Sequence, residues 1–600
     1  MAKNSILDLL LDHAQSRGGE TACLSKTAGK YGPTTWSTVW ADSSAIGKGL
    51  IALGIEPGDR VNVIGQTCYQ WVVTDLGILA AGGVTVPVYP SNLADEVQFV
   101  VDHSGGRVVF AENGEQVDKL LDKRDELGGV IKVVQWAGAK RGSDDWVITL
   151  DEFLALGRST TDAQLSERGS TLTPDSILTI IYTSGTTGRP KGVVLTHANM
   201  LYEVKTISQV DVVRQDDIQL LFLPMAHVFA KVLEVAWLGT GHVLAFAESM
   251  NTIRDNLSEV RPTLMAAVPR VFEKFYGAVV EKGTAAEGLK RTLFVKAMEL
   301  SAKHGELEEK GQKLGLVDSA QFGLLKKAVF AKVGAGIGDL LGGRMRVMVS
   351  GGAPLSKKIG WFFRDAGILV VEGYGMTESS AASTVNMPSA NQIGTVGPAL
   401  PGTQIKIASD GEILIKGPGV MREYWRNEEA TKETLDEEGW LHTGDIGEID
   451  PKTKAVRITD RKKDLIITAG GKNIAPQRIE NLVKTHKLIS QVVVHGDRRN
   501  FISALITLDP VALETHAQAH GLKGTYEQLC KLPEIRKEVE RLIAESNSEL
   551  ASYETIKKFE ILTADFSIET GELTAKLSVK RKVVNSKYGH IFDGFYDEKL

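Results

Sequence analysis

Cysteine is scarce in this sequence, which has only Cys23, Cys68 and Cys530 among 600 residues. The three lie far apart without the spacing of metal ligands, so neither a disulfide framework nor a cysteine-based metal site is expected. An excess of basic charge is also missing, because the formal net charge is −6 and the pI is about 6.1. That balance excludes the electrostatic footprint of a nucleic-acid-binding protein. We therefore expect a protein of the reducing cytoplasm with no nucleic-acid partner.

Long apolar runs are absent as well. The longest, residues 76–89, is rich in glycine, is broken by Pro87, and is too short to span a bilayer. Asp8 and Asp12 interrupt the apolar residues near the N-terminus, so no signal-peptide core is expected there. Any membrane contact should therefore be peripheral. Low-complexity tracts and repeats of 20 to 50 residues are also missing.

The sequence does have the length and pattern of a large α/β protein. Six hundred residues are too many for one core, and 43% hydrophobic with 24% charged residues is typical of globular chains. Near the N-terminus, helical and strand patterns alternate at a pitch that predicts parallel α/β layers. We expect helices over residues 34–55, 69–81 and 93–103, and strands over residues 60–64, 84–88 and 108–110.

Two later regions differ in composition. Residues 277–340 are helical, rich in Lys and Glu and interrupted by glycines, with Leu324 and Leu325 beside Lys326 and Lys327. They predict a solvated helical excursion that packs one face on the body, or an amphipathic patch that rests on a membrane.

Beyond residue 460 the pattern predicts a compact set of elements. These are a hairpin formed by residues 491–494 and 502–508, and a helix over residues 533–543. We expect a large N-terminal domain over residues 1–460 and a small, mobile α+β domain over residues 461–600, joined by a short charged hinge.

The stretch richest in chemistry is Tyr182-Thr-Ser-Gly-Thr-Thr-Gly-Arg-Pro-Lys-Gly192, between apolar runs at 177–181 and 193–195. This pattern predicts a strand, a tight loop and a second strand. Backbone N–H groups, hydroxyls and Lys191 would form a cradle for phosphate oxygens, which glycines let the backbone approach. A Walker loop is excluded, because it needs Gly-Lys-Ser/Thr followed by a helix. The alternative is a solvated turn that binds no ligand. Such a turn would explain four residues of this kind, but it explains eleven in a row poorly.

Two further strands run into glycine-containing loops, as a binding crevice at the carboxyl ends of a sheet requires. Residues 347–350 lead into Gly351-Gly-Ala-Pro-Leu355, and residues 368–371 lead into Glu372-Gly-Tyr-Gly-Met-Thr-Glu378. Tyr374 offers a flat face for a purine, Thr377 a hydroxyl for phosphate, and Glu378 an oxygen ligand for Mg²⁺. Each has a plain alternative as a packed tyrosine, a capping threonine or a surface glutamate.

These motifs together resemble those of the adenylate-forming superfamily, which comprises acyl-CoA synthetases, luciferases and the adenylation domains of peptide synthetases. The resemblance runs from about residue 20 to about residue 590. It implies that Asp445 and Arg461 contact a ribose, although Asp445 by itself reads as a turn residue. The implied nucleotide-binding positions are Thr183, Ser184, Gly185, Thr186, Thr187, Gly188, Lys191, Gly351, Gly352, Ala353, Pro354, Glu372, Gly373, Tyr374, Gly375, Met376, Thr377, Asp445 and Arg461.

The resemblance assigns further roles. Glu378 and Thr183 would bind Mg²⁺, and Lys463 would be the pivot about which the small domain turns between two half-reactions. The loop Gly470, Gly471, Lys472 and Asn473 would approach coenzyme A. Residues 223–229 and 261–273 look like those of long-chain acyl-CoA synthetases, where a helical excursion like residues 277–340 also occurs. His227 would then lie near the carboxylate, although a lone histidine is more often a satisfied core residue.

One departure from the family concerns a C-terminal lysine that reaches the acid and the α-phosphate. The segment reads Leu573-Thr-Ala-Lys-Leu-Ser-Val-Lys-Arg581, which places Ser578 at the lysine's position. In a strand Lys576, Ser578 and Lys580 point to one face, about 6.6 Å apart per step. We expect Lys576 to act, with Thr183, Lys191 and His227 as the other catalytic candidates. The alternatives are Lys580, or no lysine and slow adenylation.

The resemblance thus implies a long-chain fatty acid–CoA ligase that uses ATP, coenzyme A and Mg²⁺ and forms an acyl-adenylate intermediate. Three alternatives stay open. They are an enzyme that loads a separate carrier protein, an oxidising enzyme of the luciferase type, and a catalytically weak acyl-nucleotide-binding protein. We expect a cytoplasmic protein with possible peripheral membrane contact. The sequence does not give the oligomeric state.

Overall fold

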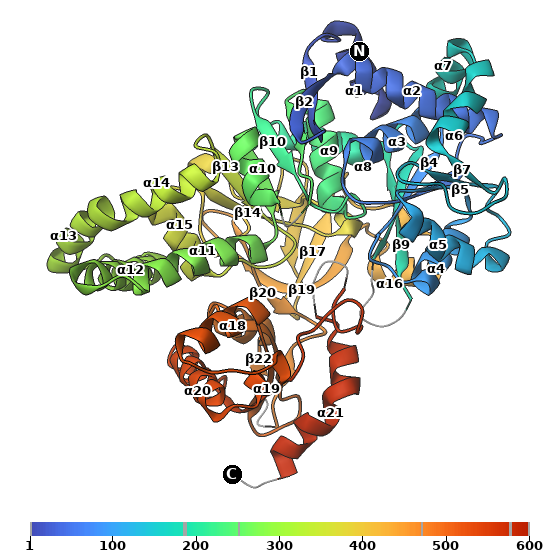
Figure 1. Cartoon of the computed structure of the whole chain (residues 1–600). Coiled ribbons are helices and arrows are strands. Elements are labelled where there is room, and N and C mark those ends of the chain that lie inside the picture. Colours follow the sequence, from blue (N-terminus) through green and yellow to red (C-terminus); the bar gives the residue numbers. More distant parts are fainter. Residues whose placement is uncertain (1–2, 184–188, 250–251, 470–471, 575–578, 598–600) are drawn as a thin grey trace.

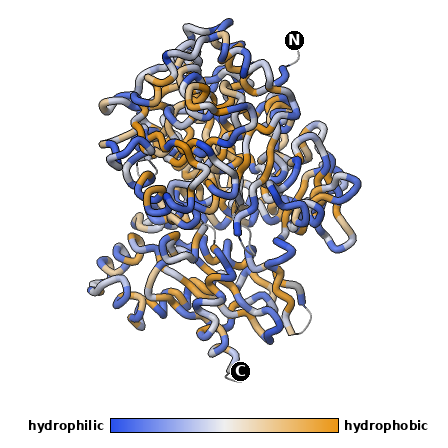
Figure 2. Tube along the Cα trace, turned by 90° about the vertical axis from the view of Figure 1, so that its right-hand side faces the viewer, coloured by the Kyte–Doolittle hydropathy of each residue, from blue (hydrophilic) through white to orange (hydrophobic). Residues whose placement is uncertain are grey.

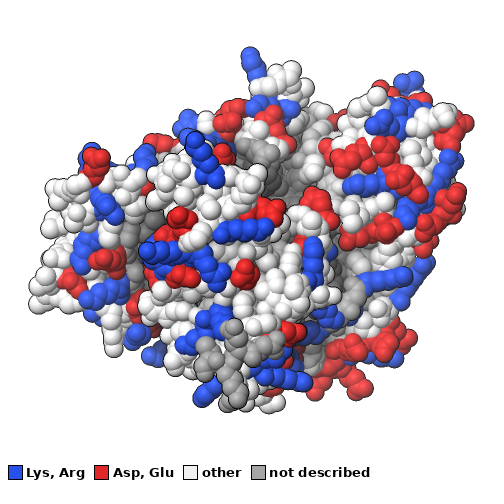
Figure 3. Space-filling view, turned by 60° about the horizontal axis from the view of Figure 1, so that its bottom comes forward, with Lys and Arg blue, Asp and Glu red and all other residues white. Residues whose placement is uncertain are grey.

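A computed structural model describes residues 3–183, 189–249, 252–469, 472–574 and 579–597. Figure 1 shows a large body, coloured blue to light orange, above a small C-terminal domain in dark orange and red. Apolar segments concentrate inside both parts, while hydrophilic segments lie mainly at the outside (Figure 2). On the face shown in Figure 3, basic and acidic side chains are interspersed.

The first large sheet contains eight strands, and the predicted strands of the N-terminal half lie in it. Its order is β18 (Glu423–Tyr424), β9 (Lys191–Thr196), β8 (Ile177–Thr183), β4 (Val84–Val88), β3 (Arg60–Ile64), β5 (Gly106–Ala111), β6 (Lys132–Gln135) and β7 (Val147–Thr149). Strands β3 to β8 are parallel, and β9 returns antiparallel to β8. The two strands expected on either side of the phosphate motif are therefore confirmed.

The second large sheet also contains eight strands and is mostly parallel. Its order is β15 (Thr384–Val385), β14 (Val370–Tyr374), β13 (Val347–Ser350), β12 (Leu264–Ala267), β10 (Ile218–Leu221), β11 (Val243–Phe246), β1 (Thr21–Thr27) and β2 (Lys30–Thr35). The prediction of a strand over residues 368–371 was shifted, because Ile368 N–H still caps the preceding helix by donating to Phe363 O at 2.9 Å. Strand β14 therefore begins at Val370 and carries Tyr374 at its carboxyl end.

Helices cover these two sheets and join their cores. They are α1 (Leu7–Ser16), α2 (Trp36–Ala52), α3 (Tyr69–Ala80), α4 (Ala94–Ser104), α5 (Gly114–Asp122), α6 (Leu150–Leu156), α7 (Asp162–Ser170), α8 (His197–Ile207), α9 (Val228–Thr240), α10 (Ile253–Val260), α15 (Lys357–Asp365) and α16 (Glu428–Thr434). Helix α2 starts later than predicted, since Thr35 ends β2 and caps the helix by accepting from Thr38 N. Trp36 of α2 stacks on Trp237 of α9 at 4.8 Å, within one continuous apolar cluster that spans both sheets.

Residues 277–340 are helical, as predicted, and form an arm that projects from the body at the left of Figure 1. The arm consists of α11 (Pro269–Thr284), α12 (Gly288–Glu309), α13 (Leu316–Leu325), a π-helical turn (Lys326–Phe330) and α14 (Ala331–Leu340). Phe330 and Phe322 bury one face of the arm against Phe362 of α15. Among the described residues, no helix combines the length and the apolar character needed to cross a membrane.

A four-stranded antiparallel sheet follows, formed by β16 (Gln404–Ile407), β17 (Glu412–Lys416), β19 (Leu441–Ile449) and β20 (Val456–Arg461). The C-terminal domain has its own apolar cluster around Ile479, Ile506 and Val539. Its elements are β21 (Ile466–Ile467), β22 (Asn473–Ile474), α17 (Pro476–Val483), β23 (Ile489–His495), β24 (Ile502–Leu508), α18 (Pro510–Ala519), α19 (Tyr526–Cys530), α20 (Pro533–Asn547), β25 (Ile556–Ile561) and α21 (Arg581–Asp597). The predicted hairpin is β23 and β24, and the predicted helix is the first part of α20. The boundary between residues 460 and 461 stays a prediction.

Candidate active site

A cleft with a volume of about 3190 Å³ lies where the two large sheets, the four-stranded sheet and the C-terminal domain meet. Strands β8, β13 and β14 end at this cleft, as expected for a crevice at the carboxyl ends of parallel strands. The structure brings together most of the site residues predicted from the sequence. Those that line the cleft are Thr183, Lys191, His227, Gly351, Gly352, Ala353, Pro354, Glu372, Gly373, Tyr374, Gly375, Met376, Thr377, Glu378, Asp445, Arg461 and Lys463.

The hairpin of β8 and β9 positions the two ends of the phosphate motif. Thr183 is the last residue of β8 and Lys191 the first of β9, and the two are paired directly across the hairpin. Since β9 begins at Lys191, a strand follows the loop, as the non-Walker interpretation requires. Ser184, Gly185, Thr186, Thr187 and Gly188 lie outside the described residues.

Tyr424 connects the cation of this motif to the carboxylate predicted to bind metal. The Lys191 ammonium lies 4.8 Å from the centre of the Tyr424 ring, and the Tyr424 hydroxyl donates to Glu378 Oε1 at 2.7 Å. Glu378 belongs to a short 3₁₀ turn after β14, in which Thr377 is also buried. The two predicted motifs therefore meet through a residue of a third segment, β18, which pairs with β9.

The residues around Glu378 fit a magnesium ion held partly by substrate. Among the described residues, no three His, Cys, Asp or Glu side chains gather as a preformed metal site. Mg²⁺ is usually held by one or two carboxylates together with phosphate oxygens and water, so it needs no such cage. A single carboxylate oriented by Tyr424 beside the phosphate hairpin satisfies that requirement.

Tyr374 and Asp445 line the cleft and contact each other. The Tyr374 hydroxyl donates to Asp445 Oδ2 at 2.6 Å, and Arg461 Nε lies 3.5 Å from Asp445 Oδ1. Asp445 and Arg461 are paired across β19 and β20, so the sheet register fixes their contact. Burial raises the pKa of Asp445, and the charge of Arg461 opposes that rise. Burial also holds the pKa of Tyr374 well above its usual value, so its hydroxyl stays a donor.

Glu372 ties the two glycine-containing loops together. Its Oε2 accepts a hydrogen bond from Leu355 N at 3.2 Å, which connects β14 to the loop after β13. The side chain is buried, and this burial raises the pKa of Glu372 to about 7. Glu372 therefore holds the Gly351–Pro354 loop against the strand that carries Tyr374.

His227 stands at the entrance of an apolar branch of the cleft. It caps α9, and its Nδ1 accepts from Phe229 N at 2.9 Å. The branch is lined by Ile207, Val210, Val212, Val213, Phe222, Leu223, Val228, Val232, Leu233, Ala236 and Leu264. A buried apolar branch of this kind has the character of a pocket for an apolar ligand.

The C-terminal residues are only partly brought to the site. Lys463 lines the cleft, but Lys472 lies elsewhere, with its Nζ 5.9 Å from the centre of the Tyr553 ring. Asn473 belongs to β22, and Gly470 and Gly471 lie outside the described residues. Lys576 and Ser578 also lie outside them, whereas Lys580 lines the cleft. Beside it, Arg581 forms a partly buried ion pair with Glu480 at 2.6 Å.

Tyr424 is the main residue that the sequence interpretation missed. No local signal identifies it, because Tyr424 reaches the site only through the long-range pairing of β18 with β9. Leu355, whose backbone N–H binds Glu372, was recognised as part of a loop and not as its anchor.

Comparisons with known proteins show to which family the chain is similar. A family model described as "AMP-binding enzyme" matches residues 10–425, and one described as "AMP-binding enzyme C-terminal domain" matches residues 463–600. The long-chain-fatty-acid–CoA ligase FadD15 of Mycobacterium bovis is 37% identical over 555 residues, covering 92% of this chain and 90% of the relative. The long-chain-fatty-acid–CoA ligase ACSBG2 of Xenopus laevis is 31% identical, covering 99% of this chain and 84% of the relative.

Solved structures share the fold. The adenylation domain of a carboxylic acid reductase from Segniliparus rugosus, in complex with AMP and a co-purified carboxylic acid, matches with a TM-score of 0.75. It is 21% identical and covers 99% of this chain and 94% of that chain. The corresponding domain from Mycobacterium chelonae matches with a TM-score of 0.77 at 20% identity, over 100% of this chain and 92% of that chain. At this identity the likeness concerns the fold alone.

Proposed function

This chain belongs to the AMP-binding enzyme family, and from that premise we propose that it is a long-chain fatty acid–CoA ligase. As a member of this family it is an acyl-activating, adenylate-forming enzyme. The finer assignment is supported chiefly by the buried apolar branch that opens beside the nucleotide-binding motifs. The names of the relatives at 31–37% identity point the same way.

The proposed reaction has two steps. A carboxylate oxygen of the fatty acid attacks the α-phosphorus of ATP, and the bond to the β-phosphate oxygen breaks to release pyrophosphate. The thiol of coenzyme A then attacks the acyl carbon, loses its proton, and displaces AMP to form the thioester. Little covalent chemistry is asked of the protein, so catalysis is mainly positioning and charge stabilisation.

Each group of residues has a part in this proposal. Lys191 and the loop before it would bind phosphate oxygens, while Tyr374, Asp445 and Arg461 would hold the adenosine. Glu378 and Thr183 would hold Mg²⁺, which supplies charge neutralisation on the phosphates when bound. His227 would lie beside the carboxylate at the mouth of the apolar branch.

The two half-reactions need different groups from the C-terminal domain. We propose Lys576 as the lysine that reaches the reacting groups during adenylation. The small domain would then turn about Lys463 and bring residues 470–473 to coenzyme A.

The test is turnover with palmitate, ATP and Mg²⁺, comparing free coenzyme A with a pantetheinylated carrier protein as the acceptor. A ligase transfers the acyl group to free coenzyme A with the higher kcat/KM. Preference for the carrier would instead identify a carrier-loading enzyme. Absence of turnover with either acceptor, across a panel of acids, would favour the weak acyl-nucleotide-binding protein suggested by Ser578.

We also propose that the helical arm rests on anionic membranes, where a fatty acid is delivered. Leu316, Val317 and Leu324 of α13 are 92%, 70% and 71% exposed, and Lys313 and Lys327 lie near them in the chain. Exposed apolar side chains flanked by lysines fit an anionic lipid surface. Co-sedimentation with anionic vesicles should be lost in Leu316→Glu/Leu324→Glu and should weaken in high salt. Equal binding to neutral vesicles, or no binding by the wild type, would contradict the proposal.

A further inference from the structure

The apolar branch runs along one face of helix α9. Val228, Val232 and Ala236 lie at positions i, i+4 and i+8 of α9, and all three line the cavity although they are at most 3% exposed. The helix connects the carboxyl end of β10 to the start of the parallel strand β11, so it descends from the active site toward the opposite edge of the sheet. Over these residues it descends about 12 Å. An extended hydrocarbon advances about 1.2 Å per bond, so this wall alone spans about ten carbons.

The segment 210–213 also lines this branch. It follows α8 and precedes β10, which places it at the amino-terminal edge of the sheet. Val210, Val212 and Val213 line the cavity and are nevertheless buried, so they face its interior and not the solvent. The lining of the cavity therefore extends from the carboxyl edge of the sheet to three valine side chains near its opposite edge.

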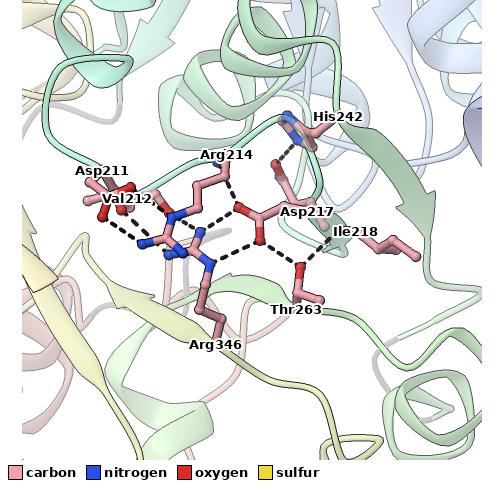
Figure 4. Close-up of polar contacts among 9 residues, drawn as sticks. Asp211, Val212, Arg214, Asp217, Ile218, His242, Thr263 and Arg346 are labelled. Carbon is pink, nitrogen blue, oxygen red and sulfur yellow. Dashed lines mark hydrogen bonds and ion pairs between the residues drawn. The ribbon is translucent and has the colours of Figure 1, made fainter.

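A polar clasp holds this segment in place (Figure 4). It is formed by Asp217, Thr263 and Arg346, each of which directly precedes one of the neighbouring parallel strands β10, β12 and β13. Asp217 Oδ1 accepts from Thr263 Oγ1 at 2.7 Å and from Arg346 Nε at 3.1 Å. Asp217 Oδ2 accepts a second bond from the Arg346 guanidinium. The clasp thus joins three strands at the edge opposite the active site.

The same clasp binds the backbone of the segment at Val212 and the backbone of Arg214, which directly follows it. The Arg346 guanidinium donates to Val212 O at 2.8 Å, and Arg214 N donates to Asp217 Oδ2 at 2.7 Å. Asp217 is 2% exposed, so moving the segment away would take the hydrogen bond of Arg214 N from a buried carboxylate. Asp211 adopts a φ of +53°, a conformation that side chains rarely take without such restraint.

We propose that residues 210–213 are the stop for the far end of the acyl chain, and that Arg346 and Asp217 set the height of that stop. This inference rests on the proposed function, because it assigns chain-length selection to that same site. Arg346 and Asp217 are positioning residues, since they act through the backbone of residues 211–214 and do not touch the substrate. Each methylene that the branch accommodates contributes about fourfold to affinity.

The first test changes the size of one valine in both directions. Val213→Ala should move the preferred chain length upward and Val213→Leu should move it downward, with affinity changing about fourfold per methylene gained or lost. Val235→Ala is the matched control, because Val235 is a buried valine of α9 that does not line the cavity. The measurements are dissociation constants and kcat/KM for saturated fatty acids of increasing length. Unchanged profiles in both Val213 variants would overturn the proposal.

The second test releases the clasp. Arg346→Ala should raise kcat/KM for longer fatty acids, while short acids keep their kcat/KM. Arg346→Lys should restore part of the selectivity, because it keeps the charge beside Asp217. Arg344→Ala is the control, since Arg344 donates to the carbonyls of Val260 and Arg261 and not to residues 210–213. An equal loss for short and long acids in Arg346→Ala would indicate general destabilisation and contradict a role in selectivity.

Binding and turnover keep the two proposals separable. If the chain length that binds best changes in the Val213 variants but no thioester forms, the stop stands and the ligase assignment fails. If thioester forms in the wild type but the preferred chain length is the same in the Val213 and Arg346 variants, the ligase assignment stands and the stop fails. If no fatty acid of any length binds the wild type, the stop is overturned directly.

Discussion

The hydroxyl of Tyr424 donates to Glu378 Oε1 at 2.7 Å, which orients the carboxylate that we assign to Mg²⁺. Tyr424 lies in β18, an edge strand of the first large sheet, and Glu378 follows β14 of the second, so the contact joins the two sheets. The same Tyr424 ring also lies beneath the ammonium of Lys191. One side chain thus fixes the relative position of the phosphate motif and the metal carboxylate.

Tyr424→Phe should therefore raise the Mg²⁺ concentration needed for half-maximal activity and lower kcat about tenfold. The lost hydrogen bond to a carboxylate is worth about 1.5–3 kcal/mol, and the ring beneath Lys191 is retained. Initial rates over a Mg²⁺ series measure this effect. Tyr31→Phe is the control, because the Tyr31 hydroxyl donates to a backbone carbonyl outside the cleft. An unchanged Mg²⁺ dependence would show that Tyr424 does not orient a metal ligand.

Lys191→Ala should slow adenylation by about 10²–10³, the usual cost of removing one group that stabilises developing charge. Lys191→Gln removes the charge while keeping a long polar side chain, so it should be nearly as slow if charge is what matters. Exchange of labelled pyrophosphate into ATP in the presence of palmitate isolates this half-reaction. Near-normal exchange in Lys191→Gln would mean that Lys191 serves packing on Tyr424 and not the phosphates.

Lys576→Ala should lose about 10²–10³ in the pyrophosphate exchange rate, whereas Lys580→Ala should change it less than threefold. The reason is that only one lysine can replace the one displaced by Ser578. Thioester formation from preformed palmitoyl-adenylate should be retained in Lys576→Ala, because the lysine serves the first half-reaction. The reverse ranking of the two variants would move the role to Lys580.

Glu372→Gln should change how stability depends on pH. The folded pKa of about 7 lies above the ordinary glutamate value, so the folded state retains a proton that the unfolded state releases. Wild-type stability should therefore fall as the pH rises from about 4.5 to about 7, and this contribution should be absent in Glu372→Gln. Between pH 5 and pH 8, the melting temperature of Glu372→Gln should increase relative to that of the wild type as the pH rises. A constant difference between the two proteins would exclude the raised pKa.

Local patterns in the sequence were sufficient for most of the fold. Strands β3, β4, β13 and β24 have the predicted bounds, because each is a short apolar run that ends at a turn signal. Strand β14 was misplaced because the capping of α15 by Ile368 depends on the geometry of the whole helix end. Motifs that are continuous in the chain, such as residues 372–378, could be placed at the site from their neighbours alone.

Relationships between distant segments could not be predicted in this way. Tyr424 meets Glu378 only because β18 joins the first sheet, and no periodicity shows which edge it joins. The clasp of Asp217, Thr263 and Arg346 could not be predicted from the sequence either, because these residues are up to 129 positions apart. Their common position before parallel strands appears only once the strand order is known.

The central claim is that a fatty acid is activated as an acyl-adenylate and passed to coenzyme A. Palmitate carrying heavy oxygen in its carboxylate tests it most directly, with AMP and palmitoyl-CoA analysed by mass spectrometry. Attack on the α-phosphorus followed by thiolysis leaves one carboxylate oxygen in AMP, so the account predicts one labelled oxygen per AMP and an equal amount of thioester. Thioester formed together with unlabelled AMP would contradict it.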